Sequence, residues 1–123
     1  MLPLATTLLG FALLLGSFLA ILHMRAKDPP CLCAWLGPVH GTIAIGGLGL
    51  LLAGLGGPPH GYATGTESFR TIAAVILAIA AFVGIVILVA RMRRWRGRGA
   101  LIGIHGTVAI AGFVVLLVYM LLA

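Results

Sequence analysis

Two histidines of this chain stand in nearly identical surroundings. His40 opens the segment HGTIAIGG and His105 opens the segment HGTVAIAG, so that six of eight positions are the same. Imidazole is a common metal ligand and a proton donor or acceptor near neutral pH. The repetition therefore predicts a site built from two copies of one motif, with an imidazole from each copy.

Small residues follow each histidine on one predicted helical face. Positions i, i+4 and i+7 share a face of a helix. The small residues on this face are Ala44 and Gly47 in the first copy, and Ala109 and Gly112 in the second. Such a strip permits close helix packing, and it also leaves a slot for a flat ring. The sequence leaves both uses open.

The elements that carry these motifs are expected to be membrane spans. The chain of 123 residues is 62% hydrophobic and only 8% charged, whereas soluble domains carry about 25% charged residues. Apolar runs occur over residues 4–23, 33–55, 71–90 and 100–123, and each is close to the length of roughly 20 residues that spans a bilayer. The sequence predicts an all-α, four-transmembrane-helix bundle as a single integral membrane domain, residues 1–123. Pro38 is expected to mark a kink or a later start of the second helix.

The duplication extends beyond the histidine motifs. Gly16, Met24 and Arg25 align with Gly84, Met92 and Arg93 when a short gap is allowed. The chain therefore resolves into two tandem helical hairpins, residues 1–57 and 69–123. The second and fourth helices run in the same direction, so the internal repeat is parallel. A two-fold axis along the membrane normal is expected to bring His40 and His105 face to face at similar depth.

The net charge of +6 is interpreted here as a topology signal, with lipid and not nucleic acid as the expected partner. Seven of the eight basic residues fall in the first and third connections, residues 25–30 and 91–99, and Arg70 falls in the second. The positive-inside rule then places the basic connections in the cytoplasm and both termini in the periplasm of a bacterial inner membrane.

The acidic residues, Asp28 and Glu67, are both expected in connections. The predicted spans then contain no carboxylate, which argues against cation-coupled transporters and small four-helix multidrug exporters, because such proteins keep an acid inside the membrane.

The chemical hypothesis is that His40 and His105 are the axial ligands of one haem b. Imidazole is a frequent haem ligand, and two axial histidines leave no open position, which favours electron transfer. Haem propionates would face the basic end, where Arg91 and Arg93 are suited to pair with carboxylates. No carboxylate is available to orient the imidazoles, so a backbone carbonyl is expected to do so. The alternatives are polar contacts between helices, the magnesium of a chlorophyll, and a non-haem metal.

The paired HGT motifs on two of four predicted helices resemble those of small four-helix membrane cytochromes b, including those that anchor dehydrogenases and pass electrons to quinone. The resemblance implies larger membrane or peripheral redox subunits as partners, and quinone as a second cofactor. Two histidines inside helices allow one haem. His23 is expected at the membrane interface, or in contact with a propionate or a quinone head group. The alternative function is a non-catalytic subunit that anchors or stabilises a larger membrane complex, and in neither case is a stand-alone enzyme expected.

Overall fold

The computed structural model describes residues 1–25, 32–57, 65–93 and 98–122, with the side chains of 32–34 and 98 left aside. These residues form four helices: α1 (Leu2–Arg25), α2 (Leu32–Leu55), α3 (Glu67–Met92) and α4 (Arg98–Leu122). Each helix is long and apolar enough to cross a membrane, with a mean hydropathy between 1.6 and 3.2. A helix satisfies its backbone hydrogen bonds internally, as a lipid environment requires. The chain is therefore an all-α, multi-pass membrane protein, and the predicted fold class is confirmed.

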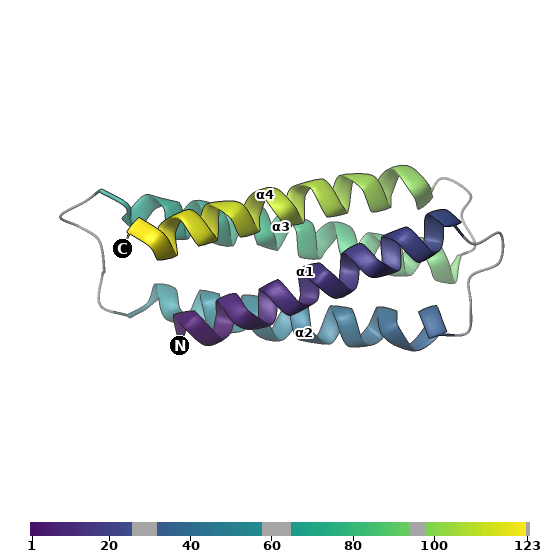
Figure 1. Cartoon of the computed structure of the whole chain (residues 1–123), viewed down its shortest axis with the longest axis horizontal. Helices are drawn as coiled ribbons and strands as arrows, with labels where there is room; N and C mark the ends of the chain where they lie inside the picture. Colours follow the sequence, from purple (N-terminus) through teal and green to yellow (C-terminus); the bar gives the residue numbers. More distant parts are fainter. Residues whose placement is uncertain (26–31, 58–64, 94–97, 123) are drawn as a thin grey trace.

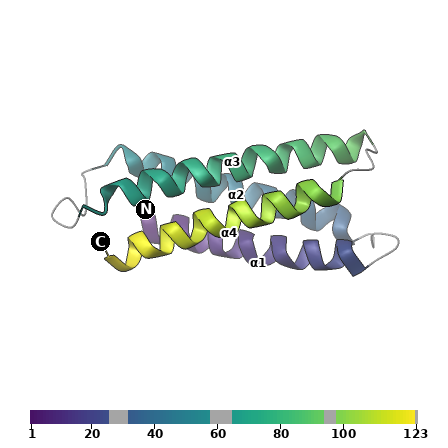
Figure 2. The same ribbon diagram turned by 90° about the horizontal axis from the view of Figure 1, so that it is seen from above.

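The helices run antiparallel in chain order, and both termini lie at the same end of the bundle (Figure 1). α1 packs along α2 and α3 packs along α4, while α1 also contacts α4 and α2 contacts α3. The view turned by 90° shows the same four-helix arrangement from above (Figure 2). The four helices thus form a square in which α2 and α4 are diagonal neighbours, which sets the two histidine-bearing helices across the bundle axis.

The internal repeat is visible in the packing, because equivalent glycines make equivalent contacts. A Cβ atom on Gly47 would lie 2.9 Å from Leu9 Cγ, in the interface between α1 and α2. A Cβ atom on Gly112 would lie 2.9 Å from Leu77 Cγ, in the interface between α3 and α4. Both glycines therefore let the two helices of a hairpin approach closely.

The tightly packed core lies in the half of the bundle that contains the termini. Its buried residues come from all four helices, and they are Ala5, Leu9, Leu51, Ala73, Ala74, Leu77, Leu116 and Tyr119. Leu51 and Leu116 occupy equivalent places in the repeat and are both fully buried. The other half of the bundle, toward the basic end, contains the histidines.

The expected placement of Glu67 and Arg70 in a connection is wrong, because α3 begins at Glu67. Both residues belong to the first turn, where a carboxylate is favoured by the helix dipole. Arg70 is 5% exposed; its guanidinium pairs with Glu67 and donates to the Gly54 carbonyl at 3.1 Å. Charged residues lower the hydropathy of residues 67–70 but do not end the helix. The apolar run over residues 71–90 is therefore shorter than α3. The contact with Gly54 ties α3 to the last turn of α2.

The expected later start of the second helix at Pro38 is also wrong, since α2 is helical from Leu32 onward. The hydroxyl of Thr42 donates to the Pro38 carbonyl at 2.9 Å. Thr107 makes the equivalent bond to Gly103, also at 2.9 Å. These hydroxyls are therefore satisfied within their own helices.

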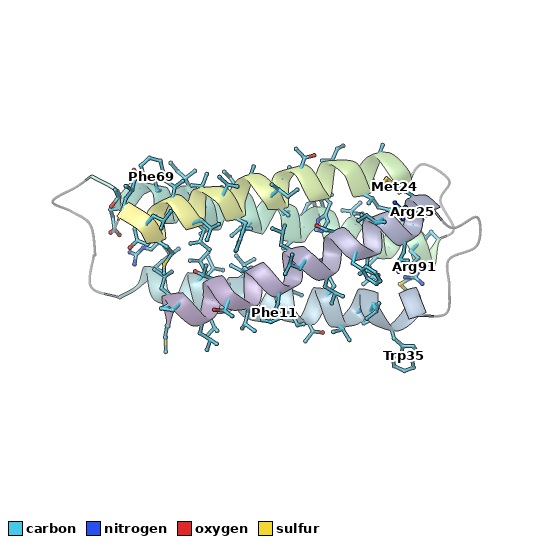
Figure 3. The ribbon with its side chains drawn as sticks, in the orientation of Figure 1. Phe11, Met24, Arg25, Trp35, Phe69 and Arg91 are labelled. Carbon is cyan, nitrogen blue, oxygen red and sulfur yellow. The ribbon has the colours of Figure 1, made fainter. Side chains whose placement is uncertain are left out.

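The ends of the bundle carry the side chains expected at membrane interfaces. Arg25, Trp35 and Arg91 gather at the end opposite the termini, and Phe69 lies at the terminal end (Figure 3). Trp35 is 75% exposed. Tryptophan and arginine at this level are typical of the boundary between hydrocarbon and head groups.

We expect Gly47→Ala and Gly112→Ala each to lower the free energy of unfolding by about 1–3 kcal/mol, because the added methyl group overpacks a hairpin interface. Unfolding of the purified protein in mixed detergent micelles measures this loss. Gly46→Ala and Gly49→Ala are the matched controls, since nothing lies within 4 Å of a Cβ atom at either position. Equal stability of all four variants would contradict the packing role.

Candidate functional site

The structure brings His40 and His105 together at the centre of the bundle. Their ring centroids are 6.0 Å apart, and the ring planes are inclined at 86°. His40 comes from α2 and His105 from α4, the helices on one diagonal of the square. Both residues are half-buried. The two copies of the motif therefore form one site.

Each imidazole is hydrogen-bonded to a backbone carbonyl of its hairpin partner. His40 Nδ1 donates to the Ala12 carbonyl at 2.9 Å, and His105 Nδ1 donates to the Ala80 carbonyl at 2.8 Å. A carbonyl oxygen only accepts, so the proton lies on Nδ1 in both rings. A neutral imidazole protonated at Nδ1 has its lone pair on Nε2, which is the nitrogen left to bind a metal.

A glycine one turn beyond each accepting carbonyl makes room for the ring. A Cβ atom on Gly16 would lie 2.7 Å from His40 Cε1. A Cβ atom on Gly84 would lie 3.1 Å from His105 Cε1. Because a carbonyl at i is bonded to the N–H at i+4, Gly16 stands directly beside the Ala12 carbonyl. A side chain there would cover the carbonyl that the imidazole uses.

Gly16 and Gly84 are equivalent in the internal repeat, but neither is among the site residues predicted from the sequence. The available signal is the Ala-x-x-x-Gly pattern formed by Ala12 with Gly16 and by Ala80 with Gly84. The role of this pattern depends on the carbonyl oxygens of Ala12 and Ala80. Every residue has a carbonyl, so the sequence does not mark these two.

A cavity of about 450 Å³ lies beside the histidines, between α1 and α4. His40 and His105 line it together with Ala44 and Ala109, the small residues one turn further along α2 and α4. Its walls are mainly apolar. The small faces predicted from the sequence thus border this cavity as far as Ala44 and Ala109.

The cavity is closed toward the termini and reaches the basic end. Phe113 forms part of its floor, and the ring of Phe113 lies 3.2 Å from the place of a Cβ atom on Gly10. At the other end the lining includes His23, Met24 and Gly99, all of them exposed. The cavity therefore extends from the middle of the bundle to its basic end.

The remaining predicted site residues lie outside the cavity lining. Gly47 and Gly112 lie in the interfaces within the hairpins. Arg91 and Arg93 are exposed at the basic end, where Arg91 Nη1 lies 3.6 Å from the place of a Cβ atom on Gly37. The rest of the arginine cluster, over residues 94–97, lies outside the described residues.

No protein-family model matches the chain, and neither a curated protein nor a solved structure matches it significantly.

We expect Gly16→Ala to displace the His40 ring and to weaken its hydrogen bond to Ala12, because the new methyl group would lie 2.7 Å from Cε1. Imidazole nitrogen chemical shifts of ¹⁵N-histidine-labelled protein in micelles report the loss of the Nδ1–H bond. Gly41→Ala is the control, since the space around Gly41 is open. A His40 signal unchanged by Gly16→Ala would refute the steric argument.

Proposed function

We propose that this chain is a small membrane b-type cytochrome subunit that holds one haem b between His40 and His105 and moves electrons between a redox partner and the quinone pool. The observation that carries the proposal is the pair of imidazoles, each with Nδ1 held by a carbonyl, at the wall of one cavity. Metal-binding histidines commonly donate their second N–H in this way, which fixes the ring and raises the basicity of the ligating nitrogen.

The spacing of the rings would allow both imidazoles to hold one metal. With metal–nitrogen bonds of about 2 Å, such a metal would require ring centres roughly 6 Å apart. The observed centroid separation is 6.0 Å. The two rings would hold the metal through Nε2, and the angle of 86° between their planes is compatible with this.

The walls of the cavity suit a flat apolar ring system. Ala44, Ala109 and Gly16 line it beside the histidines, and none of them has a side chain larger than a methyl group. When bound, haem would supply a one-electron redox centre without an open coordination position. The residues of the chain orient the imidazoles and exclude water from the packed half of the bundle.

The orientation in the membrane is part of the same proposal. Arg25, Arg91 and Arg93 stand at the end toward which the cavity extends, where they would attract the propionates and the redox partner. The excess of basic residues favours a bacterial inner membrane with this end in the cytoplasm and the termini in the periplasm.

A second candidate function is that of a non-catalytic subunit that anchors a larger membrane complex. The same 6.0 Å separation with rings at 86° falls in the range of direct edge-to-face contact between rings. Hydrogen bonds to the Ala12 and Ala80 carbonyls then satisfy the imidazoles without any cofactor.

The absorption spectrum of the purified protein distinguishes the two functions. We expect Soret and α bands of haem b in the wild-type protein, and their loss in His40→Ala and in His105→Ala, because one axial ligand is removed. Val39→Ala and Ile104→Ala are matched controls, since these neighbouring residues are 46% and 53% exposed on the same helices. They should keep both bands.

A colourless wild-type protein, expressed with sufficient haem, would favour the anchoring function. A histidine variant with a full reduced spectrum would contradict the ligand assignment.

Reporter fusions test the proposed orientation. We expect alkaline phosphatase fused after Ala123 to be active, because the positive-inside rule places both termini in the periplasm. The same enzyme fused after Arg93 should be inactive. The reverse pattern would show that the basic end faces the periplasm.

A further inference from the structure

The two hairpins meet along two seams, one between α2 and α3 and one between α1 and α4. The internal repeat makes these seams equivalent, but the chain joins only one of them. α2 and α3 follow one another in the sequence, so the connection between the hairpins joins them at the terminal end (Figure 1). α1 and α4 have no direct connection. The chain itself therefore restrains the α2/α3 seam and leaves the α1/α4 seam to side-chain contacts.

Two arginines of α3 cross the α2/α3 seam, one near each end of the helix. Arg70, in the first turn, donates to the Gly54 carbonyl of α2 at 3.1 Å, and hydrogen bonds from charged donors are stronger than neutral ones. Arg91, in the last turn, places Nη1 3.6 Å from the position of a Cβ atom on Gly37 of α2. The α2/α3 seam is thus held at both ends.

The α1/α4 seam is held differently. The positions of α1 that are equivalent to the two arginines are occupied by Leu2 and His23, so no guanidinium stands there. In the packed half of the bundle, the ring of Phe113 on α4 lies against Gly10 of α1 and closes this seam. From that level to the basic end, the seam borders the cavity.

Small side chains on α1 widen the basic half of the α1/α4 seam. Ser17 and Ala20 line the cavity, and neither of their equivalents on α3, Ile85 and Leu88, does so. Regions with few buried apolar contacts open at a low cost in free energy. The basic half of the α1/α4 seam is therefore the part of the interface between the hairpins that separates most easily.

The contacts that position the histidines lie within the hairpins and not between them. His40 of α2 is bonded to a carbonyl of α1, and His105 of α4 is bonded to a carbonyl of α3. The close contacts at Gly47 and Gly112 also join α1 to α2 and α3 to α4. The hairpins can therefore part in the basic half without breaking either imidazole hydrogen bond, and each hairpin moves as one body.

We propose that the hairpins part at the basic half of the α1/α4 seam, with the α2/α3 seam as the hinge, and that this movement admits a ligand into the cavity. Rotation about a hinge is a common way for proteins to admit and enclose ligands. The ligand is a flat, largely apolar ring system, for which the small residues beside the histidines leave room in about 450 Å³. Its identification as haem rests on the proposed cytochrome function, whereas the movement itself does not.

Distances between spin labels, measured by electron paramagnetic resonance in lipid nanodiscs, test the hinge in the full chain. Both native cysteines are replaced by serine. One label pair, Met24→Cys with Ala100→Cys, spans the α1/α4 seam at the basic end. The pair Met92→Cys with Trp35→Cys occupies the equivalent positions across the α2/α3 seam, and all four residues are exposed. We expect a broad distribution with a longer second component for the first pair, and a single narrow distribution for the second.

A substitution in the hinge makes the same test more specific. Arg91→His gives α3 the residue that α1 has at the equivalent position, and it should broaden the distribution of the α2/α3 pair. Arg93→His is the matched control, because Arg93 is also exposed and also adjoins the label at position 92; it should leave the distribution narrow. Equal widths for the two label pairs, a broader distribution at the α2/α3 seam, or equal effects of the two histidine substitutions would overturn the inference.

A second experiment tests the entry route. A bismaleimide that bridges Met24→Cys and Ala100→Cys should abolish the uptake of added haemin by the haem-free protein, followed by the Soret band. The same bridge between Met92→Cys and Trp35→Cys should leave uptake unchanged. Undiminished uptake with the α1/α4 bridge in place would refute this entry route. Should the unbridged protein take up no haemin, the cytochrome proposal fails, and the spin-label distances still decide for or against the hinge.

Discussion

The structure depends on an unusual use of two helix carbonyls. The carbonyls of Ala12 and Ala80 each accept a hydrogen bond from a backbone N–H of their own helix. Each also accepts a second hydrogen bond, from an imidazole Nδ1–H of the neighbouring helix. A carbonyl oxygen has two lone pairs, so it can accept both bonds. In a lipid environment an unpaired N–H is costly, and these bonds therefore fix where each histidine lies. They also fix the tautomer, the direction of the ring and the close approach of two helices at a glycine.

From this constraint follows the division of the bundle into a packed half and a hollow half. Toward the termini, leucines and alanines from all four helices fill the space between the hairpins, and the Phe113 ring lies against Gly10 at the boundary. Beyond that level the helices carry alanine, glycine and histidine, which leave a cavity of about 450 Å³. The same two-fold repeat produces both halves, and the difference between them lies in the volume of the side chains.

Much of this arrangement was predictable from the sequence. The apolar runs and the repeated HGT motif indicate four spans and two equivalent imidazoles, because hydropathy and duplication are properties of side chains. The carbonyls of Ala12 and Ala80 were not predictable as partners, since every residue has one. The roles of Gly47 and Gly16 were also hidden: helical periodicity places Gly47 on the histidine face, but only the direction of the neighbouring helix shows that it contacts Leu9. The start of α3 was missed because Glu67 and Arg70 neutralise one another inside a helical turn.

The parallel repeat has a consequence for the origin of the molecule. Two copies of one such hairpin, related by a two-fold axis, would present two identical histidines to one another in the manner of a symmetric homodimer. When the two copies are fused in one chain, each half can acquire substitutions independently of the other. The second copy has Arg70 where the first copy has Leu2, and Arg91 where the first copy has His23. Both are differences of that kind. A single chain can thus give its two sides different neighbours, which a homodimer of hairpins cannot do.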